Sequence, residues 1–235
     1  IDPFAQDAQE FLNLLNALDG LAFDDKSLAM DKWVALDCGM LPGAFVGFAV
    51  DADDLDKKDK QKYSIGDYGG LVPITEFCAI PSAHEGIWIG HTLASYFKKK
   101  GYGTMTEALG MEVFDSEKMV GVAQYNNSSI KVHSKFGELE LISAITYAHS
   151  LPDMSFTFSV KKPDAHELLE IIQKPLSVDE SIVEADFLLD PSNLVKKMEM
   201  QENLETGSAK YFIQPPGWVI NEGKIKIPVT KPANK

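Results

Sequence analysis

The sequence of 235 residues contains no arginine: lysine supplies all 22 residues of the combined lysine and arginine count, against 35 aspartates and glutamates. Any phosphate must therefore be bound by lysine or by backbone N–H groups, because the planar, paired donors of a guanidinium are missing. The net charge of −13 argues against a nucleic-acid partner, since binding phosphates requires a positive surface. Cationic or neutral partners fit this composition better.

Cysteine is also scarce. Cys38 and Cys78 are the two cysteines, with no Cys-x-x-Cys spacing, which favours a reducing, cytoplasmic setting. No apolar run approaches the roughly 18–20 residues of a membrane-spanning helix, so no membrane association is expected. The five histidines show no metal-binding spacing, and no metal site is expected. The oligomeric state stays open.

The first half of the chain alternates between helical and extended patterns. Leucines and a phenylalanine at helical spacing predict a helix at 7–18. Apolar runs bounded by glycine and proline predict four strands, the first two forming a hairpin. These strands lie at 32–38, 43–51, 69–80 and 85–97. The charged run 51–62 between them is expected to be a solvated loop.

Helical and extended patterns continue to alternate after residue 100. Thr104 is followed three residues later by Glu107, which predicts a capping box at a helix start. A strand, a short helix and two more strands are then expected at 118–125, 127–137, 138–149 and 153–161. This order indicates an α/β fold.

The pattern changes at Pro163. Two helices, at 164–173 and from Asp190 to about Glu205, precede a small hairpin turned at 221–223. Few aromatic and branched residues are available there for a separate core. We therefore predict a main domain at 6–162, with 163–235 as an α+β extension packed on it.

The segment Lys98-Lys99-Lys100-Gly101-Tyr102-Gly103-Thr104 has the construction of a phosphate cradle. It lies where a predicted strand passes through glycines into a predicted helix. Glycines let the backbone approach a ligand, and the first N–H groups of a helix have no intrahelical partner. A lysine cluster before glycines is more often a solvated turn, so the segment alone does not establish a phosphate site.

Two ordered motifs resemble the GNAT superfamily of acetyl-coenzyme A-dependent N-acetyltransferases. Lys98-x-x-Gly101-x-Gly103 is similar to that family's pyrophosphate loop, which has arginine or glutamine in first place. Downstream, five residues match the family's second motif: Asn126, Ser129, Ile130, Lys135 and Gly137. The tripeptide WIG at 88–90 and the TEAL at 106–109 further resemble the branch that acetylates ribosomal-protein N-termini.

The resemblance implies a twisted, mixed and mostly antiparallel sheet flanked by helices over about residues 6–161. It departs from the family at Lys98, at His133 in place of a tyrosine, at Glu138 in place of a phenylalanine, and in an insertion at about 52–70. Nothing in the family pattern matches the residues after 162.

The same resemblance implies where acetyl-coenzyme A, as co-substrate, would lie. Its pantetheine arm would contact the backbone near Leu93 and Ala94, and its pyrophosphate would rest on the amides from Lys99 to Thr104. Asn126 would hold a backbone or cofactor group. The acceptor is an amine of unknown identity, and the acidic composition favours a cationic one.

Acyl transfer to an amine needs a base for the ammonium proton and an acid for the leaving thiolate. Glu76 and His91, on neighbouring predicted strands, are the candidate bases. His133, at the position of the family's tyrosine, is the candidate acid, with Tyr125 as its substitute. A lone glutamate near a strand end is more often solvated, and a lone histidine is more often a structural residue than a catalyst.

Two alternatives remain. The segments around 79–81, 110–121 and 136–146 also resemble the acetoacetate decarboxylase superfamily, in which Lys118 would form a Schiff base. Such a lysine must be unprotonated near neutral pH, whereas Glu117 beside it favours the protonated form. The other alternative is a GNAT-like protein that binds ligands without catalysis.

Overall fold

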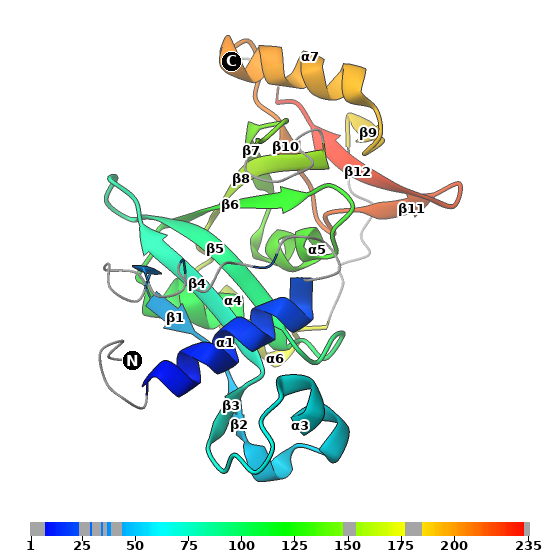
Figure 1. The fold of residues 1–235 in the computed structure, drawn as a ribbon. Helices are drawn as coiled ribbons and strands as arrows, with labels where there is room; N and C mark the ends of the chain where they lie inside the picture. The colour runs from blue at the N-terminus through cyan, green and yellow to red at the C-terminus, as the bar shows by residue number, and fades with distance from the viewer. Residues whose placement is uncertain are drawn as a thin grey trace. The chain divides into compact units, whose positions relative to one another are not determined.

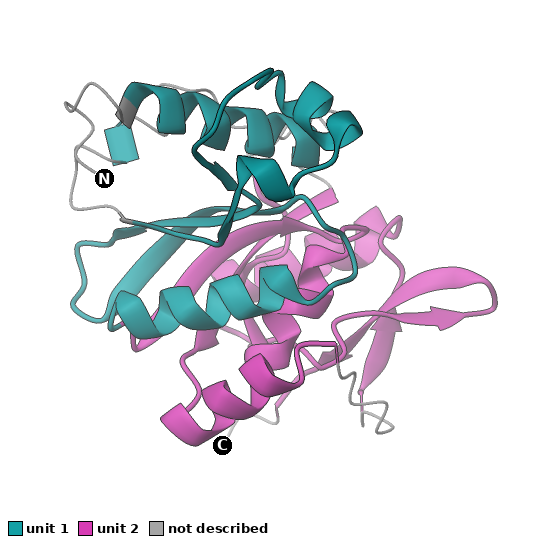
Figure 2. Ribbon diagram, turned by 90° about the horizontal axis from the view of Figure 1, so that it is seen from below, with its two compact units in different colours: residues 1–115 teal, residues 116–235 magenta. Residues whose placement is uncertain are grey.

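The computed structural model describes residues 8–23, 29, 34, 37–38, 44–147, 154–176 and 185–232. The chain divides into two compact units, residues 1–115 and 116–235 (Figures 1 and 2). Each unit combines antiparallel strands with helices. The predicted fold class, a mixed α/β protein with a mostly antiparallel sheet flanked by helices, is therefore confirmed. Within these ranges, no helix is both long enough and apolar enough to cross a membrane.

The sheet of the first unit is centred on strand β4 (Thr75–Pro81). This strand pairs antiparallel with β1 (Ala44–Val46) on one side and with β5 (Ile87–Ser95) on the other. A separate antiparallel pair joins β2 (Ala49–Asp51) to β3 (Leu71–Pro73). Strand β4 is buried over most of its length, since it lies between β1 and β5.

Helices α1 (Ala8–Phe23) and α4 (Tyr102–Val113) lie on opposite faces of this sheet (Figure 2). The α1 face carries Thr92, whose hydroxyl donates to Asp19 of α1 at 2.9 Å. The α4 face carries Thr75, whose hydroxyl accepts from Thr106 of α4 at 2.7 Å. Alternation along the strands thus assigns each β4 and β5 side chain to one helix or the other.

The second unit contains a six-stranded antiparallel path. Its strands, in spatial order, are β6 (Lys118–Gln124), β8 (Ser155–Lys161), β7 (Leu139–Ser143), β10 (Phe212–Ile213), β12 (Lys224–Thr230) and β11 (Val219–Asn221). Strand β9 (Phe187–Leu189) also pairs with β12. The last two strands of the path form the hairpin predicted at the C-terminal end.

The described helices of the second unit are α5 (Ser129–His133), which the 3-10 turn η3 (Ser134–Phe136) follows, α6 (Ala165–Gln173) and α7 (Leu194–Glu205). Asp164 caps α6 and forms a capping box with Glu167. Asn193 caps α7 by accepting from the Lys196 amide, so this helix begins later than Asp190.

Three local predictions were wrong. Val34, Asp37 and Cys38 are helical, so these residues do not form the strand expected at 32–38 or its hairpin, and β1 pairs with β4. The charged run 51–62 is ordered as the turn η2 (Ala52–Asp54) and helix α3 (Lys57–Tyr63). Aspartate caps explain this, since Asp51 and Asp56 each accept a backbone N–H at a helix start.

Strand β10 comes from the predicted extension and pairs with β7 of the predicted main domain. The two segments therefore share one sheet within the second unit. The division at residue 162 stays a prediction about domain organisation.

Candidate anion-binding and active site

Strand β5 ends at Ser95 and helix α4 begins at Tyr102, so the predicted passage from strand to helix is present. Two residues in the connecting turn have left-handed backbones, Lys99 with φ of 58° and Gly101 with φ of 85°. Glycine adopts this conformation without a Cβ penalty, whereas lysine does so at a cost. The turn therefore reverses the chain through a backbone conformation that most residues avoid.

The amides of the turn before α4 have few acceptors among the described residues. Gly101 is the N-cap of α4 and provides no side-chain hydrogen bond, and the first intrahelical bond runs from the Met105 amide to the Gly101 carbonyl at 3.0 Å. Across the described ranges, none of the amides from Lys99 to Thr104 donates to a protein acceptor. A helix start with unpaired N–H groups attracts anions through its donors and its dipole.

Thr104 does not cap the helix, contrary to the prediction. It lies within the first turn of α4 and is buried, as is Glu107. The cap is Gly101, three residues earlier. Gly101 has no side chain that could accept from the first N–H groups of α4.

Lysines Lys98, Lys99 and Lys100 are all exposed on the turn. A fourth lysine, Lys62 of α3, donates to the Tyr96 hydroxyl at 2.8 Å and lies 5.0 Å from the centre of the Tyr96 ring. Tyr96 follows β5 directly and also donates to Asp59 of α3. Tyr96 and its two partners therefore tie the start of the turn to α3.

No prediction from the sequence included this contact. It depends on α3, which lies in the charged run 51–62 that was expected to be a loop. An aspartate at 56 followed by a run of good helix formers was the available signal.

Gly103 leaves open space at the helix start. A Cβ placed on it would meet only the Ser95 Cβ, at 3.9 Å, which is an ordinary van der Waals contact. By contrast, a Cβ on Gly110 of the same helix would lie 2.3 Å from Cδ1 of Phe77. The protein therefore requires glycine at 110 for packing but has no steric need of it at 103.

Glu76 lies on β4 and is 1% exposed. Neither of its carboxylate oxygens has a hydrogen-bond partner among the described residues. Burial, and to a lesser extent the nearby Asp19 carboxylate, raises the pKa of Glu76 well above its ordinary value. A raised pKa suits a proton acceptor, but an amine reaching this carboxylate would first have to open the surrounding core.

His91 lies on β5 at a β-bulge, where Cys78 pairs with Thr92 and Ala79 pairs with Gly90. His91 is the extra residue of the bulge and is exposed. Partial burial lowers the pKa of its imidazole, which favours the neutral form that accepts a proton. Leu93 and Ala94 follow on the same strand, paired with Phe77 and Glu76 of β4.

Asn126, His133 and Tyr125 belong to the second unit. Asn126 is exposed in the turn after β6, while the neighbouring Asn127 accepts from the Ser129 amide at 3.1 Å. His133 is the last residue of α5, and its ring lies 4.9 Å from the Phe158 ring, centre to centre. Asn126 is therefore accessible to solvent, and His133 is partly accessible.

Tyr125 is completely buried. Its hydroxyl donates to the Ala144 carbonyl at 3.0 Å, and burial raises the pKa of the phenol. The Nζ atom of the buried Lys197 lies 5.3 Å from the ring centre. These contacts favour a structural role for Tyr125 over proton donation to a ligand.

Lys118, the candidate Schiff-base lysine, lies on β6 and forms an ion pair with Glu140 at 3.1 Å. Lys210 pairs with the same carboxylate at 3.0 Å. A Schiff-base nucleophile must present its nitrogen to a carbonyl carbon, whereas the nitrogen of Lys118 is engaged by a carboxylate. This geometry disfavours the decarboxylase alternative.

No protein-family model matches the chain, and no curated protein matches it. Among solved structures, it is similar to aminoglycoside 6'-acetyltransferase type Ii, with 11% identity, a TM-score of 0.46, and coverage of 68% of this chain and 96% of that chain. A second match is a Desulfovibrio desulfuricans protein described as a GNAT-family acetyltransferase. It has 12% identity, a TM-score of 0.41 and coverage of 67% and 94%.

A third match is an Acinetobacter baylyi ADP1 protein described as an acetyltransferase, with 15% identity, a TM-score of 0.38 and coverage of 67% and 88%. Structures described as acetyltransferases, one of them by name a GNAT protein, are thus among those that this chain resembles.

Proposed function

We propose that the chain is an acyl-coenzyme A-dependent N-acetyltransferase that binds the diphosphate of its acyl donor at the start of α4. The observation that carries this proposal is that, in the part of the chain that the structure describes, no backbone acceptor pairs with the amides from Lys99 to Thr104. A diphosphate supplies acceptors for several N–H groups at once, and the helix dipole favours its charge. The absence of arginine gives these amides added importance, because only lysine side chains can assist them.

Three exposed lysines complete the proposed cradle. As point charges on flexible stems, they would neutralise the phosphates without fixing their orientation. Orientation would come from the amides, whose directions the helix sets. Gly103 supports this arrangement, because its missing Cβ leaves the backbone open to a ligand.

In the proposed reaction, the unprotonated amine attacks the thioester carbonyl, the bond from carbon to sulfur breaks, and the thiolate takes a proton. Of the two candidate bases, we favour His91, since it is exposed and its lowered pKa leaves a neutral imidazole near pH 7. Glu76 is sealed from solvent. Of the two candidate acids that the resemblance implies, Tyr125 is the less suitable, because its hydroxyl is already bonded to a carbonyl.

The acceptor is proposed to be a cationic amine. The chain carries a net charge of −13, so a positively charged substrate is attracted at long range. Polyamines, aminoglycosides and basic peptide termini share this chemistry. Neither Glu76 nor the exposed carboxylates of the first unit give a reason to prefer one of these three classes of amine.

Thermal unfolding with and without acetyl-coenzyme A tests the proposal. A ligand that binds only the native state raises Tm in proportion to the logarithm of its concentration above Kd. We expect acetyl-coenzyme A to raise Tm and pantetheine, which lacks the diphosphate, to leave it unchanged. Equal effects of the two compounds, or no effect of either, would contradict a diphosphate site.

Release of the free thiol in the presence of an amine panel then tests catalysis. Release that depends on both amine and acetyl-coenzyme A supports a transferase. Binding of acetyl-coenzyme A without thiol release would instead support the non-catalytic alternative.

A further inference from the structure

The two cysteines of the chain meet in the first unit. Cys38 and Cys78 are separated in the sequence by the segment that holds β1, β2, α3 and β3. Their side chains are nevertheless in contact, because the thiol of Cys78 donates a hydrogen bond to the sulfur of Cys38. The chain contains no other cysteine. The fold therefore brings together the thiols that are available for a disulfide.

Both thiols are buried at the sheet of the first unit. Cys38 is 4% exposed and Cys78 is fully buried. Cys78 lies on β4, where it pairs with Phe45 of β1 and with Thr92 of β5, so neighbouring strands hold it on both sides. Cys38 is helical. A disulfide tolerates little distortion, so it needs sulfur atoms that already face each other, and a thiol–thiol hydrogen bond places them so.

Other uses of a thiol pair fit these surroundings less well. Burial raises the pKa of Cys38 and of Cys78, whereas a nucleophilic cysteine needs a lowered pKa. A structural zinc site takes further ligands beside two thiolates. In the part of the chain that the structure describes, no group of three or more histidine, cysteine, aspartate or glutamate side chains is arranged to hold a metal ion. The contact thus favours covalent pairing over nucleophilic catalysis.

We propose that Cys38 and Cys78 form an intramolecular disulfide when the chain folds with a small disulfide oxidant such as oxidised glutathione, and that this bond fixes residue 38 to β4. The proposal does not depend on the proposed acetyltransferase activity, since it involves neither the turn before α4 nor an acyl donor.

The bond forms by two successive thiol–disulfide exchanges. The thiolate of one cysteine attacks a sulfur of the oxidant, which breaks the oxidant's disulfide, forms a mixed disulfide and releases a first glutathione thiol. The thiolate of the other cysteine then attacks the cysteine sulfur of the mixed disulfide and releases a second glutathione thiol. The pair loses two protons and two electrons, and the two released thiols gain them.

Burial determines when this exchange occurs. A buried thiol with a raised pKa holds little thiolate and is out of reach of a dissolved oxidant. The bond should therefore form while the chain folds or while it is open. For the same reason, a reductant should cleave the bond slowly in the folded protein and rapidly in denaturant.

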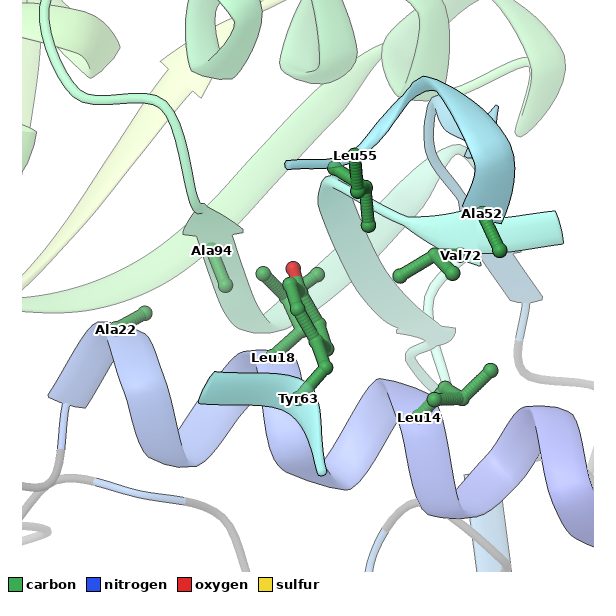
Figure 3. Packing of buried hydrophobic residues seen from close by; sticks show 8 residues of the cluster. All are labelled: Leu14, Leu18, Ala22, Ala52, Leu55, Tyr63, Val72 and Ala94. Atoms are coloured by element: carbon green, nitrogen blue, oxygen red, sulfur yellow. The ribbon is translucent and has the colours of Figure 1, made fainter. Parts of the chain in front are cut away.

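The bond would close a loop over residues 38–78, and this loop supplies part of the core of the first unit. The loop residues Ala52, Leu55, Tyr63 and Val72 pack in one cluster with Leu14, Leu18, Ala22 and Ala94 (Figure 3). A cross-link over a long loop removes many conformations of the unfolded chain and so stabilises the folded state. The disulfide should therefore stabilise the packing of this loop against α1 and β5.

Refolding in a defined redox buffer tests the proposal. The reduced and denatured full chain is refolded with reduced and oxidised glutathione, quenched with acid, and alkylated with a maleimide in denaturant. We expect a monomer with no free thiol, and digestion without reductant should give a cross-linked peptide that joins Cys38 to Cys78. Alkylation of both cysteines, stable glutathione adducts, or disulfide-linked dimers would overturn the proposal.

Thermal unfolding tests the constraint that the bond imposes. The oxidised native chain should have a Tm about 5–15 °C above that of the same chain refolded with a reductant. Cys38→Ala cannot form the bond, so its Tm should be the same under both conditions. Equal Tm values for the oxidised and reduced native chains would contradict the constraint. The thiol count on the native sequence decides the proposal even if the variant fails to fold.

Discussion

The hydroxyl of Thr106 in α4 donates to the hydroxyl of Thr75 in β4 at 2.7 Å, and both side chains are buried. Thr75 also accepts the Phe48 amide at 2.9 Å. This contact fixes the first turns of α4 against the sheet and so helps to hold the helix start in place.

Replacing Thr106 by valine should destabilise the first unit by about 1–2 kcal/mol, because a buried hydroxyl partner is lost with little change of shape. Thr106→Ser keeps the hydroxyl and should recover much of that loss. Chemical denaturation of both variants checks this. Equal stability of the valine and native proteins would show that the contact contributes nothing.

Gly103→Ala should weaken ligand binding while it raises the stability of the fold. Alanine fits at 103 and has the higher helix propensity, so the free energy of unfolding should rise by about 0.4–1 kcal/mol. Acetyl-coenzyme A affinity should fall by about tenfold or more, which corresponds to ~1.4 kcal/mol. Calorimetric titration and denaturation together give both quantities.

Gly110→Ala is the matched control in the same helix. Its Cβ would overlap the Phe77 ring, which should cost about 1–3 kcal/mol of stability. The folded fraction should still bind acetyl-coenzyme A. If Gly103→Ala binds as tightly as the native protein, the diphosphate does not lie against this residue.

Lys100→Gln should weaken acetyl-coenzyme A binding by about 2- to 5-fold at low salt, as expected for one exposed ion pair. The difference from the native protein should shrink as salt increases, since added ions screen surface charge. Lys224→Gln makes the same change of net charge in the β11–β12 hairpin and should have no such effect. Binding measured over a salt series distinguishes local contact from general attraction.

Glu140 should contribute to stability at neutral pH and lose that contribution in acid. Partial burial raises the pKa of Glu140, but hydrogen bonds from Lys210 and Lys118 outweigh it, so the net pKa is lowered. A lowered folded pKa gives stability that is present above the unfolded pKa and is lost as pH falls. Glu140→Gln should therefore lose up to about 1 kcal/mol at pH 7 and show a shallower fall in Tm below pH 5.

The same ion pair predicts the outcome of Schiff-base trapping. With a keto acid and borohydride, Lys118 should not be labelled above the level of exposed lysines such as Lys224. Selective labelling of Lys118, located by peptide mapping, would restore the decarboxylase alternative.

Elements with a strong local pattern were predictable from the sequence. The leucine stripe of α1, the long apolar runs of β4 and β5, and the Asp164 cap of α6 each specify one structure locally. The helical conformation of Val34, Asp37 and Cys38 was not predictable in this way. A short apolar run fits a strand and a buried helix equally well, and tertiary packing decides between them.

The backbone path of the candidate site was predictable from the sequence, but the positions of its side chains were not. Glycines at 101 and 103 after an apolar run specify the turn into α4, and the structure contains that turn. The helix start was misplaced because Thr104 and Glu107 match a capping box but are buried against the protein. The buried state of Glu76 and Tyr125 depends on which elements cover them, and spacing along the chain does not carry that information.

Strands β10 and β12 have a consequence for shortened versions of the protein. Phe212 and Ile213 pair with β7 on one side and β12 on the other. A chain cut before residue 212 would leave the outer backbone groups of β7 unpaired. Such an open edge invites another chain to add its own strand, so truncated preparations should self-associate.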